Sequence, residues 1–562
     1  MRYITYMVNL LIIVLLLALG WTTYLFYQTQ KLTQKQSQLL TAKVQESVKD
    51  SQLHDIPDVM QTTDTVTKKQ LWTRVQQQFK DTVVQVFSQI AEFNWIEPYK
   101  TPNQMEATGS AFFINDSGQL ITNAHVVEQA QAVSIQIPSL GKRRFDVTIL
   151  GISPERDLAL LEVKPAELEA IKKALGKDKL PYMLMGNSDH IHRADKIMAL
   201  GYPLGQQGLK STTGVVSGRE HIQGQHFIQI SAPLNKGNSG GPSLNSSGEV
   251  VGVNSAGIAN AQNVGYIIPS NDVQLFLRQI RDLLPSQSPI LLRKPYLGVI
   301  FTSASDSLTA YLKNPPPGGL YVVEVYKGSP LQKAGVQPGD MMYEINGHAI
   351  DMYGEMNVDW SLEDKISIID YISRLKVGDD VRLVIYRKGV RKELTLTFAQ
   401  TALAPIRVMY PGYEGIDYEV MAGLIVMQLT LNHVLYLVKA APDLMQYADF
   451  KKQMEPLLVV TQVQLNSPAY RTRVITPGTI ITHVNNELVK TLDDFRKAVL
   501  KSTDTGYLTL KTKDNGFVVL SLPDIIQDEE RLAALYFYRL SSTYKDLKQK
   551  FEQQHAAQTV KV

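Results

Sequence analysis

The 562-residue chain contains no cysteine. This absence excludes disulfides, thiolate nucleophiles, zinc-thiolate sites and thiol redox switching. No block of lysine or arginine stands out among the 57 basic and 54 acidic side chains, and the net charge is only +3. We therefore expect no nucleic-acid partner. Four histidines between residues 190 and 226 lack metal-ligand spacing with carboxylates or thiols, so we expect no metal site there; they are His190, His192, His221 and His226.

Charged residues are also missing from Tyr3 to Gln30. About 20 apolar residues suffice to cross a bilayer, and aromatic residues such as Trp21 favour its interface. Residues 1–30 are therefore predicted to form a transmembrane anchor. A cleaved signal peptide is the alternative, because Ala18-Leu19-Gly20 resembles a small-residue cleavage site. The few basic residues on either side of the span leave its orientation open.

The length indicates three or more domains. Residues 31–70 are polar and poor in aromatic residues, which is typical of a solvated linker. From Leu71 the apolar residues follow helical or mixed spacing, and short β-like runs separated by turn residues come next. These runs predict a mainly-β domain over residues 71–288, of barrel or sandwich type, which a helix over Asp272 to Leu284 closes.

Two later segments share one order of residues. Residues 328–350 and 466–489 each place Ser-Pro before a short helix, then Pro-Gly, a strand and an Asn-containing turn. An internal duplication of one small α/β module is the economical interpretation. It predicts domains at 291–402 and 405–527, and a charged helical tail at 528–562 that packs on the second module or on a neighbouring subunit.

The sequence Gly237-Asn238-Ser239-Gly240-Gly241-Pro242 surrounds a candidate nucleophile. A serine hydroxyl needs a base to take its proton, and the resulting oxyanion needs N–H donors. Glycines permit the tight turn that aims such donors inward. We predict an oxyanion hole at Gly237, Asn238 and Ser239. Taken alone, the same hexapeptide is also compatible with a Gly-rich turn that carries a spectator serine.

Two further motifs precede this serine in the chain. Thr122 to Val127 contains His125 at the end of a β-like run, and Asp157 directly precedes the apolar run Leu158 to Leu161. The order His, Asp, Ser is that of the chymotrypsin arrangement, in which the histidine is the general base and the aspartate orients it. A carboxylate beside a buried strand requires a partner. His125, Asp157 and Ser239 are therefore the predicted catalytic triad.

The motifs TNAHVV, DLALL and GNSGG resemble those of the Deg/HtrA family of serine proteases almost letter for letter. The resemblance extends through ALGYPLG at residues 199–205 and covers about residues 71–527. It implies a chymotrypsin-like double β-barrel followed by two PDZ-like domains, endopeptidase activity (EC 3.4.21), no cofactor, and a trimer or a multiple of trimers.

The run Ala422-Gly423-Leu424-Ile425-Val426 makes the second module most similar to that of plant-type Deg proteases. Plant members have organellar transit peptides, whereas this chain begins with an apolar segment. We therefore expect a bacterial envelope enzyme that is anchored in the inner membrane and faces the periplasm. Release into the periplasm after signal cleavage is the alternative.

One departure from the family concerns substrate choice. The residues before the nucleophile turn are Ser231-Ala232-Pro233-Leu234-Asn235, where the family usually has Asp-Ala-Ala-Ile-Asn. A proline at position 233 cannot bind Lys or Arg, as an acid there does in trypsin-like enzymes. We expect cleavage after small or medium apolar residues.

The first module is predicted to bind apolar C-terminal peptides at Tyr296, Leu297, Gly298 and Val299. Backbone N–H groups there would capture the carboxylate while the peptide adds as a β-strand. The alternative is that these residues merely start a strand. In the second module, Gly423 is the matching residue, and the insertion from Thr430 to Gln453 is placed to fill or cover the groove. An intramolecular or oligomer contact is the competing interpretation there.

Three functions are compatible with this set of motifs. The first is a quality-control protease that degrades unfolded, misfolded or exposed-terminus proteins. The second is a chaperone or binding protein whose protease site is inactive at rest. The third is a dedicated regulatory protease that cuts one membrane-bound signalling substrate. Cleavage of unfolded casein distinguishes the general enzyme from the dedicated one.

Overall fold

The computed structural model describes residues 79–206, 208–222, 224–255, 264–284, 289–295, 297–399 and 401–559. The predicted anchor at 1–30 and the predicted linker at 31–70 lie outside these residues. Among the helices in the described part, none is long and apolar enough to cross a membrane.

The first body is a ring of six antiparallel strands in the order β5-β4-β1-β2-β3-β6, which the β5–β6 pair closes. Its strand β6 is almost wholly buried, as its apolar sequence LALLEV predicts. The elements are β1 (Val83–Glu92), β2 (Asn103–Phe113), β3 (Gln119–Thr122), α3 (Ala124–Val127), β4 (Ala130–Gln136), η1 (Pro138–Leu140), β5 (Arg144–Ser153), η2 (Pro154–Arg156), β6 (Leu158–Val163) and α4 (Pro165–Leu175).

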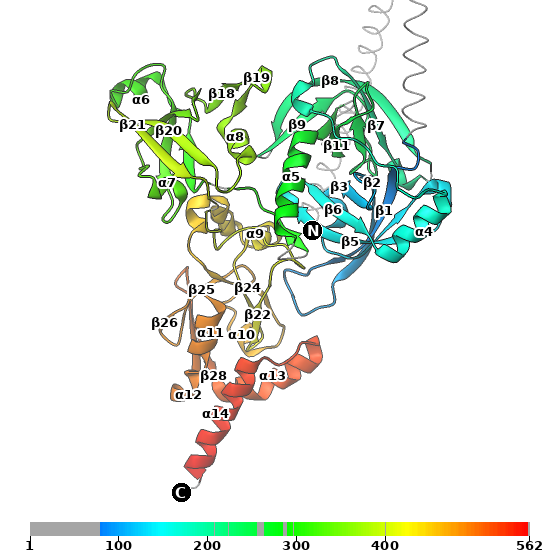
Figure 1. Cartoon of the computed structure of the whole chain (residues 1–562). Helices are drawn as coiled ribbons and strands as arrows, with labels where there is room; N and C mark the ends of the chain where they lie inside the picture. The colour runs from blue at the N-terminus through cyan, green and yellow to red at the C-terminus, as the bar shows by residue number, and fades with distance from the viewer. Residues whose placement is uncertain are drawn as a thin grey trace, which may run out of the picture. The chain divides into compact units, whose positions relative to one another are not determined.

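The second body is a closed barrel in the order β10-β11-β12-β9-β8-β7. Helix α5 packs on β11 and β12, and it begins at Ser270, two residues before the predicted start (Figure 1). The elements are η3 (Ser188–His190), β7 (Lys196–Gly201), η4 (Pro203–Gly205), β8 (Lys210–Ile222), β9 (Gln225–Ile230), β10 (Pro242–Leu244), β11 (Val250–Ser255), β12 (Gly265–Pro269), α5 (Ser270–Leu283) and β13 (Ile290–Leu291), which pairs with β5.

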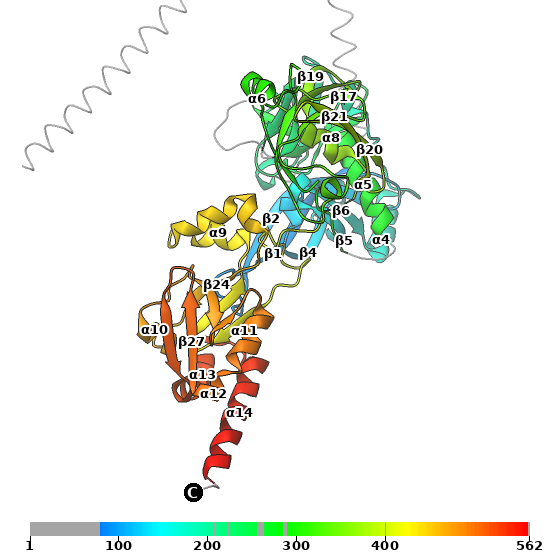
Figure 2. The ribbon, with the colours of Figure 1, turned by 90° about the vertical axis from the view of Figure 1, so that its left-hand side faces the viewer.

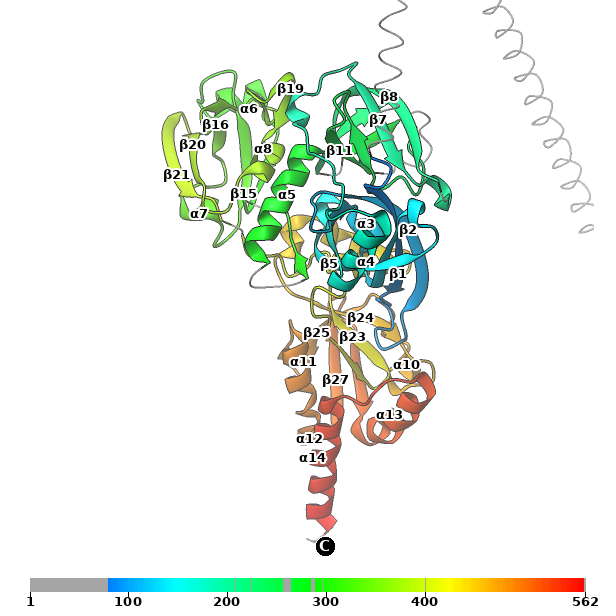
Figure 3. The same cartoon turned by 45° about the vertical axis from the view of Figure 1, so that its right-hand side comes forward.

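The first of the two duplicated modules is a sheet in the order β14-β15-β16-β20-β21, to which β17 adds at β16 (Figure 3). Strand β14 is an edge strand of this sheet. The elements are β14 (Val299–Thr302), α6 (Asp306–Tyr311), β15 (Leu320–Val325), α7 (Pro330–Lys333), β16 (Met341–Ile345), β17 (His348–Ala349), β18 (Glu355–Val358), β19 (Ser361–Ser367), α8 (Ile368–Arg374), β20 (Asp380–Arg387) and β21 (Val390–Thr397).

The second module repeats this order but adds a strand in front, giving β22-β23-β24-β25-β27-β28 with β26 at β25. Figure 2 shows two strands of this sheet, β24 and β27. The elements are β22 (Tyr418–Met421), β23 (Leu424–Gln428), α9 (Leu431–Leu437), η5 (Pro442–Ala448), η6 (Phe450–Gln453), β24 (Leu458–Val463), α10 (Pro468–Thr472), β25 (Ile480–Val484), β26 (Glu487–Leu488), α11 (Leu492–Val499), α12 (Ser502–Thr505), β27 (Tyr507–Thr512) and β28 (Phe517–Ser521).

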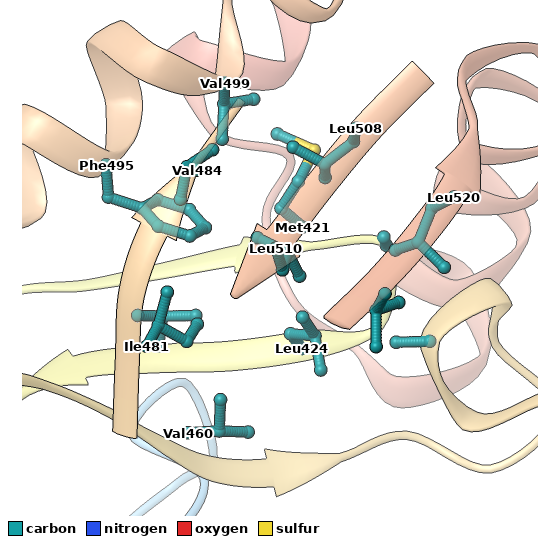
Figure 4. Close-up of a cluster of buried hydrophobic side chains, with 14 of the residues drawn as sticks. Met421, Leu424, Val460, Ile481, Val484, Phe495, Val499, Leu508, Leu510 and Leu520 are labelled. Carbon is teal, nitrogen blue, oxygen red and sulfur yellow. The ribbon is translucent and has the colours of Figure 1, made fainter. Parts of the chain in front are cut away.

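The tail forms two helices, α13 (Leu522–Tyr536) and α14 (Ser542–Thr559). Both contribute to the core of the second module, through Ile525 of α13 and Tyr544 of α14. Figure 4 shows the centre of this core, where Phe495 of α11 meets the apolar side chains of the sheet. Tyr544 lies within the predicted tail of residues 528–562, so the tail packs on the second module, which is one of the two alternatives that the sequence left open.

Candidate active site

His125 stands on the one-turn helix α3, directly after the short strand β3. Its side chain is half exposed, and its Nδ1 lies 2.8 Å and 3.0 Å from the two carboxylate oxygens of Asp157. Burial alone lowers the pKa of His125, but the hydrogen bond and the negative charge of Asp157 outweigh it, and the net pKa is raised. Asp157 therefore stabilises the protonated imidazole.

Asp157 is held by more than the histidine ring. It caps η2 in the left-handed region, at φ 53°, a conformation that Asp tolerates better than most residues. Its Oδ1 also accepts from the His125 backbone N–H at 3.1 Å, and its carbonyl accepts from the Asn123 side chain at 2.9 Å. Its Oδ2 accepts from the Ser255 hydroxyl at 3.3 Å. These bonds fix the carboxylate against the His125 turn.

Ser239 lies in the turn before β10, and it is buried. Two contacts place this turn against the His125 turn. A Cβ on Gly240 would lie 2.3 Å from the Thr122 hydroxyl and 3.1 Å from the Asn123 nitrogen, so only glycine fits there. The Ser239 carbonyl accepts from the Ser110 N–H at 2.8 Å. The fold thus places the Ser239 turn beside the residues that precede His125, and His125 in turn contacts Asp157 from a third segment.

Two backbone N–H groups beside Ser239 are available for an oxyanion. The Lys236 carbonyl accepts from the Leu204 N–H at 2.8 Å, so the Gly237 N–H on the same trans peptide points the opposite way. Within the described part of the chain, neither the Gly237 N–H nor the Ser239 N–H donates to a protein acceptor. The Asn238 N–H, by contrast, donates to the Asn235 carbonyl at 2.9 Å and is occupied.

The Ser239 hydroxyl and the His125 ring form no hydrogen bond with each other in this structure, which describes both residues in full. Catalytic hydrogen bonds are often long in free enzymes and shorten when substrate binds. The arrangement therefore contains an oriented imidazole, a serine and two open N–H donors, which is the set of groups that acyl transfer requires.

Sequence reasoning missed the residues that support this set. Ser110 on β2 donates its hydroxyl to the Gly237 carbonyl at 2.8 Å, which fixes the donor turn. Ser255 at the end of β11 holds Asp157. Each makes its contact across more than 90 positions of sequence, so no local pattern could have indicated either role.

Three of the four predicted residues of the first peptide groove are described, and Tyr296 lies outside the described residues. Leu297 and Val299 are buried at the start of β14, and Gly298 adopts φ 72°. Beside them lies a cavity of about 740 Å³. Its apolar lining includes Leu297, Val299, Phe301, Ile369 and Ile372.

Two of the four histidines for which we expected no metal-binding role, His221 and His226, make contacts with other residues of the chain. His221 and His226 are partners on the β8–β9 hairpin. His221 Nδ1 lies 3.0 Å from the Asp370 carboxylate, and burial lowers the pKa of His226.

Comparisons with known proteins agree with this arrangement. The trypsin-like peptidase domain matches residues 109–253, and the PDZ domain matches residues 295–398. The probable periplasmic serine endoprotease DegP-like of Chlamydia trachomatis is 28% identical over 430 residues, which are 75% of this chain and 76% of that protein. The periplasmic pH-dependent serine endoprotease DegQ of Escherichia coli is 30% identical over 329 residues, 57% of this chain and 65% of that protein. This chain is a serine peptidase of the Deg/HtrA family.

Proposed function

We propose that the chain is an endopeptidase of the bacterial cell envelope that degrades misfolded proteins or proteins with exposed termini. Ser239 Oγ attacks the peptide carbonyl while His125 takes the hydroxyl proton, and Asp157 stabilises the imidazolium that forms. The N–H groups of Gly237 and Ser239 bind the oxyanion. His125 then donates the proton to the leaving amine. Water next attacks the acyl-enzyme ester while His125 takes its proton, and His125 returns that proton to Ser239 Oγ as the new carboxyl group leaves.

The observation that carries this proposal is the 2.8 Å contact between His125 Nδ1 and Asp157 beside the Ser239 turn. With Nδ1–H donated to the carboxylate, the neutral ring presents Nε2 as the base. Because Asp157 raises the pKa of His125, the ring accepts the serine proton more readily than an isolated imidazole would.

The proposed location and substrates of the enzyme are supported by its relatives and by the first module, not by the catalytic residues. The relatives from Chlamydia trachomatis and Escherichia coli are named periplasmic endoproteases. We therefore infer a periplasmic catalytic domain, held at the inner membrane by residues 1–30, with signal cleavage and release as the alternative. The apolar cavity beside β14 favours apolar C-terminal peptides as partners. A homotrimer, or a multiple of trimers, is the assembly that the family resemblance implies.

The first experiment is casein cleavage by the purified chain and by its Ser239→Ala variant at several temperatures. Loss of the nucleophile should lower the rate at least about a thousandfold, because only binding and the oxyanion hole remain. Ser247→Ala is the matched control, because this exposed serine of the β10–β11 turn should be replaceable without effect.

Three outcomes would count against parts of the proposal. Equal rates for the wild type and Ser239→Ala would contradict the mechanism. An inert wild type that still binds unfolded casein would favour a chaperone with a resting-inactive site. A wild type that leaves casein intact but cuts one membrane signalling protein would favour the dedicated regulatory protease.

A further inference from the structure

Equivalent residues of the two duplicated modules can be identified from the contacts that they make. Gly298 and Gly423 both have positive φ, 72° and 82°. A Cβ on either would lie against the serine of the Ser-Pro pair, 2.4 Å from Ser329 Cβ and 2.1 Å from Ser467 Cβ. Both glycine carbonyls accept at 2.8 Å from the residue three positions before that serine. Strand β14 of the first module therefore corresponds to β23 of the second.

The outer edges of these two strands differ. Among the strands that the structure describes, β14 pairs with β15 alone, and Val299, Ile300 and Phe301 of β14 line the apolar cavity. Strand β23 has two neighbours, because β22 pairs antiparallel with it through four residue pairs, from Tyr418↔Met427 to Met421↔Leu424. A C-terminal peptide adds to a PDZ module as an antiparallel strand at this edge. In the second module, the chain's own β22 occupies that place.

The helix that borders the groove, α8 in the first module and α11 in the second, also differs between the modules at the position that faces the groove. Counted from the N-caps Ser367 and Thr491, Ile372 of α8 corresponds to Arg496 of α11. Ile372 lines the cavity of the first module. Arg496 instead holds β22, because its Nε donates to the buried Glu419 carboxylate at 2.8 Å and its Nη2 donates to the Tyr418 carbonyl at 3.0 Å. Helix α11 is therefore adapted to hold β22, through the Glu419 carboxylate and the Tyr418 carbonyl.

The position of the peptide carboxylate is also taken. The Ala422 N–H, which corresponds to that of Leu297 in the first module, donates at 2.7 Å to Oε2 of Glu529 from α13. The Glu529 side chain is fully buried, and its Oε1 accepts from the Tyr538 hydroxyl at 2.6 Å. A carboxylate on a backbone N–H of this loop is the contact that a bound C-terminus makes.

We propose that the second module is a PDZ-type groove filled by its own chain, with β22 in place of the peptide strand and Glu529 in place of the peptide carboxylate. External apolar C-termini then bind at the first module alone. From the sequence we expected the insertion from Thr430 to Gln453 to fill or cover this groove. In the proposal, β22 and Glu529 of α13 fill it instead. The insertion packs elsewhere, with its His433 against Trp95.

The test measures peptide binding, not cleavage, in the full-length chain carrying Ser239→Ala. The probe is a fluorescein-labelled ten-residue peptide with a free C-terminal valine, and its amidated form is the control. Anisotropy titration should give one peptide per chain. Ile369→Asp, at an exposed position beside the first groove, should weaken binding at least tenfold. The residue that matches Ile369 in the second module is already Asp493.

Asp493→Ile is the reciprocal variant, and it should add no second site, because β22 rather than this charge fills the groove. Two peptides per chain in the parent Ser239→Ala chain or after the added Asp493→Ile change would overturn the proposal. Binding that survives the added Ile369→Asp change, or a parent chain that binds no peptide, would overturn it as well. This assignment rests on the proposed function, but the two fail separately: equal casein cleavage by the wild type and Ser239→Ala refutes the protease mechanism, whereas a second bound peptide per chain refutes the filled groove.

Discussion

Gly237 shows how one residue controls the proposed oxyanion site. Its φ is 100°, and a Cβ would lie 2.4 Å from the Tyr202 carbonyl oxygen. An alanine must therefore shift the turn and the N–H group that it carries. We expect Gly237→Ala to lower kcat about 100-fold to 1000-fold, the usual effect of losing one oxyanion donor. Initial rates on a fluorogenic peptide, with thermal unfolding of the same samples, measure it.

Gly176→Ala is the control for backbone strain alone. Gly176 caps helix α4 with φ 64°, and a Cβ there would meet no atom within 4 Å. This variant should lose about 1 kcal/mol of stability and keep its kcat. If Gly237→Ala retained a kcat within threefold of the wild type, the Gly237 N–H would not be an oxyanion donor.

The connection between β1 and β2 links distant parts of the chain. Trp95 in this connection is buried in a cluster with Met427 and Val434, and it meets His433 edge to face at 5.2 Å. The Ile96 carbonyl accepts from the Thr461 hydroxyl at 2.7 Å. The connection therefore stabilises the second module as well as joining two strands of the first barrel.

Trp95→Ala should destabilise the chain by about 3–5 kcal/mol, the usual cost of removing a large buried aromatic side chain. Urea unfolding, followed by circular dichroism, measures it. Tyr311→Ala removes an exposed aromatic side chain from α6 and should change stability by less than about 0.5 kcal/mol. Equal midpoints for the two variants would show that the packing of Trp95 contributes no stability.

Over the whole molecule, two buried groups make stability depend on pH in opposite directions. Burial lowers the pKa of His433 to about 3, so the folded chain does not bind the proton that the unfolded chain takes up near pH 6.5. The His433 contribution is present above pH 6.5 and is lost as the pH falls. Burial raises the pKa of Glu529 to about 7, so its contribution is present below about pH 4.5 and is lost as the pH rises through 7.

Each missing or extra proton changes the free energy of unfolding by about 1.4 kcal/mol per pH unit. Between pH 6 and 4.5, His433→Gln should therefore lose less stability on acidification than the wild type. Glu529→Gln should lose less on raising the pH from 4.5 to 7. Urea titrations at half-unit pH steps measure both differences. Curves parallel to the wild type would mean that these groups titrate alike in the folded and unfolded chain.

Much of the organisation was predictable because its signals are local. The Ser-Pro and Pro-Gly pairs identified the duplication, and the ends of α5 differ from the predicted helix by one or two residues. Helical or mixed spacing near Val83 left β1 undecided, since both faces of this strand are partly buried. Pairing with β2 and β4 made it a strand. Strand β22 could not be recognised as a groove filler, because its pairing with the next strand, β23, is that of an ordinary hairpin, and its contact Arg496 lies 77 positions from Glu419.

The sequence by itself was enough to propose the chemistry, since the proposed nucleophile, base and orienting carboxylate each occupy a short motif: Ser239, His125 and Asp157. Only the tertiary structure decided which groups support them and which groove is open. Those choices depend on contacts such as Ser110 with Gly237 and Ala422 with Glu529, which are 127 and 107 positions apart. A hydrogen bond or a filled strand edge depends on distance in space, and local patterns carry no information about it.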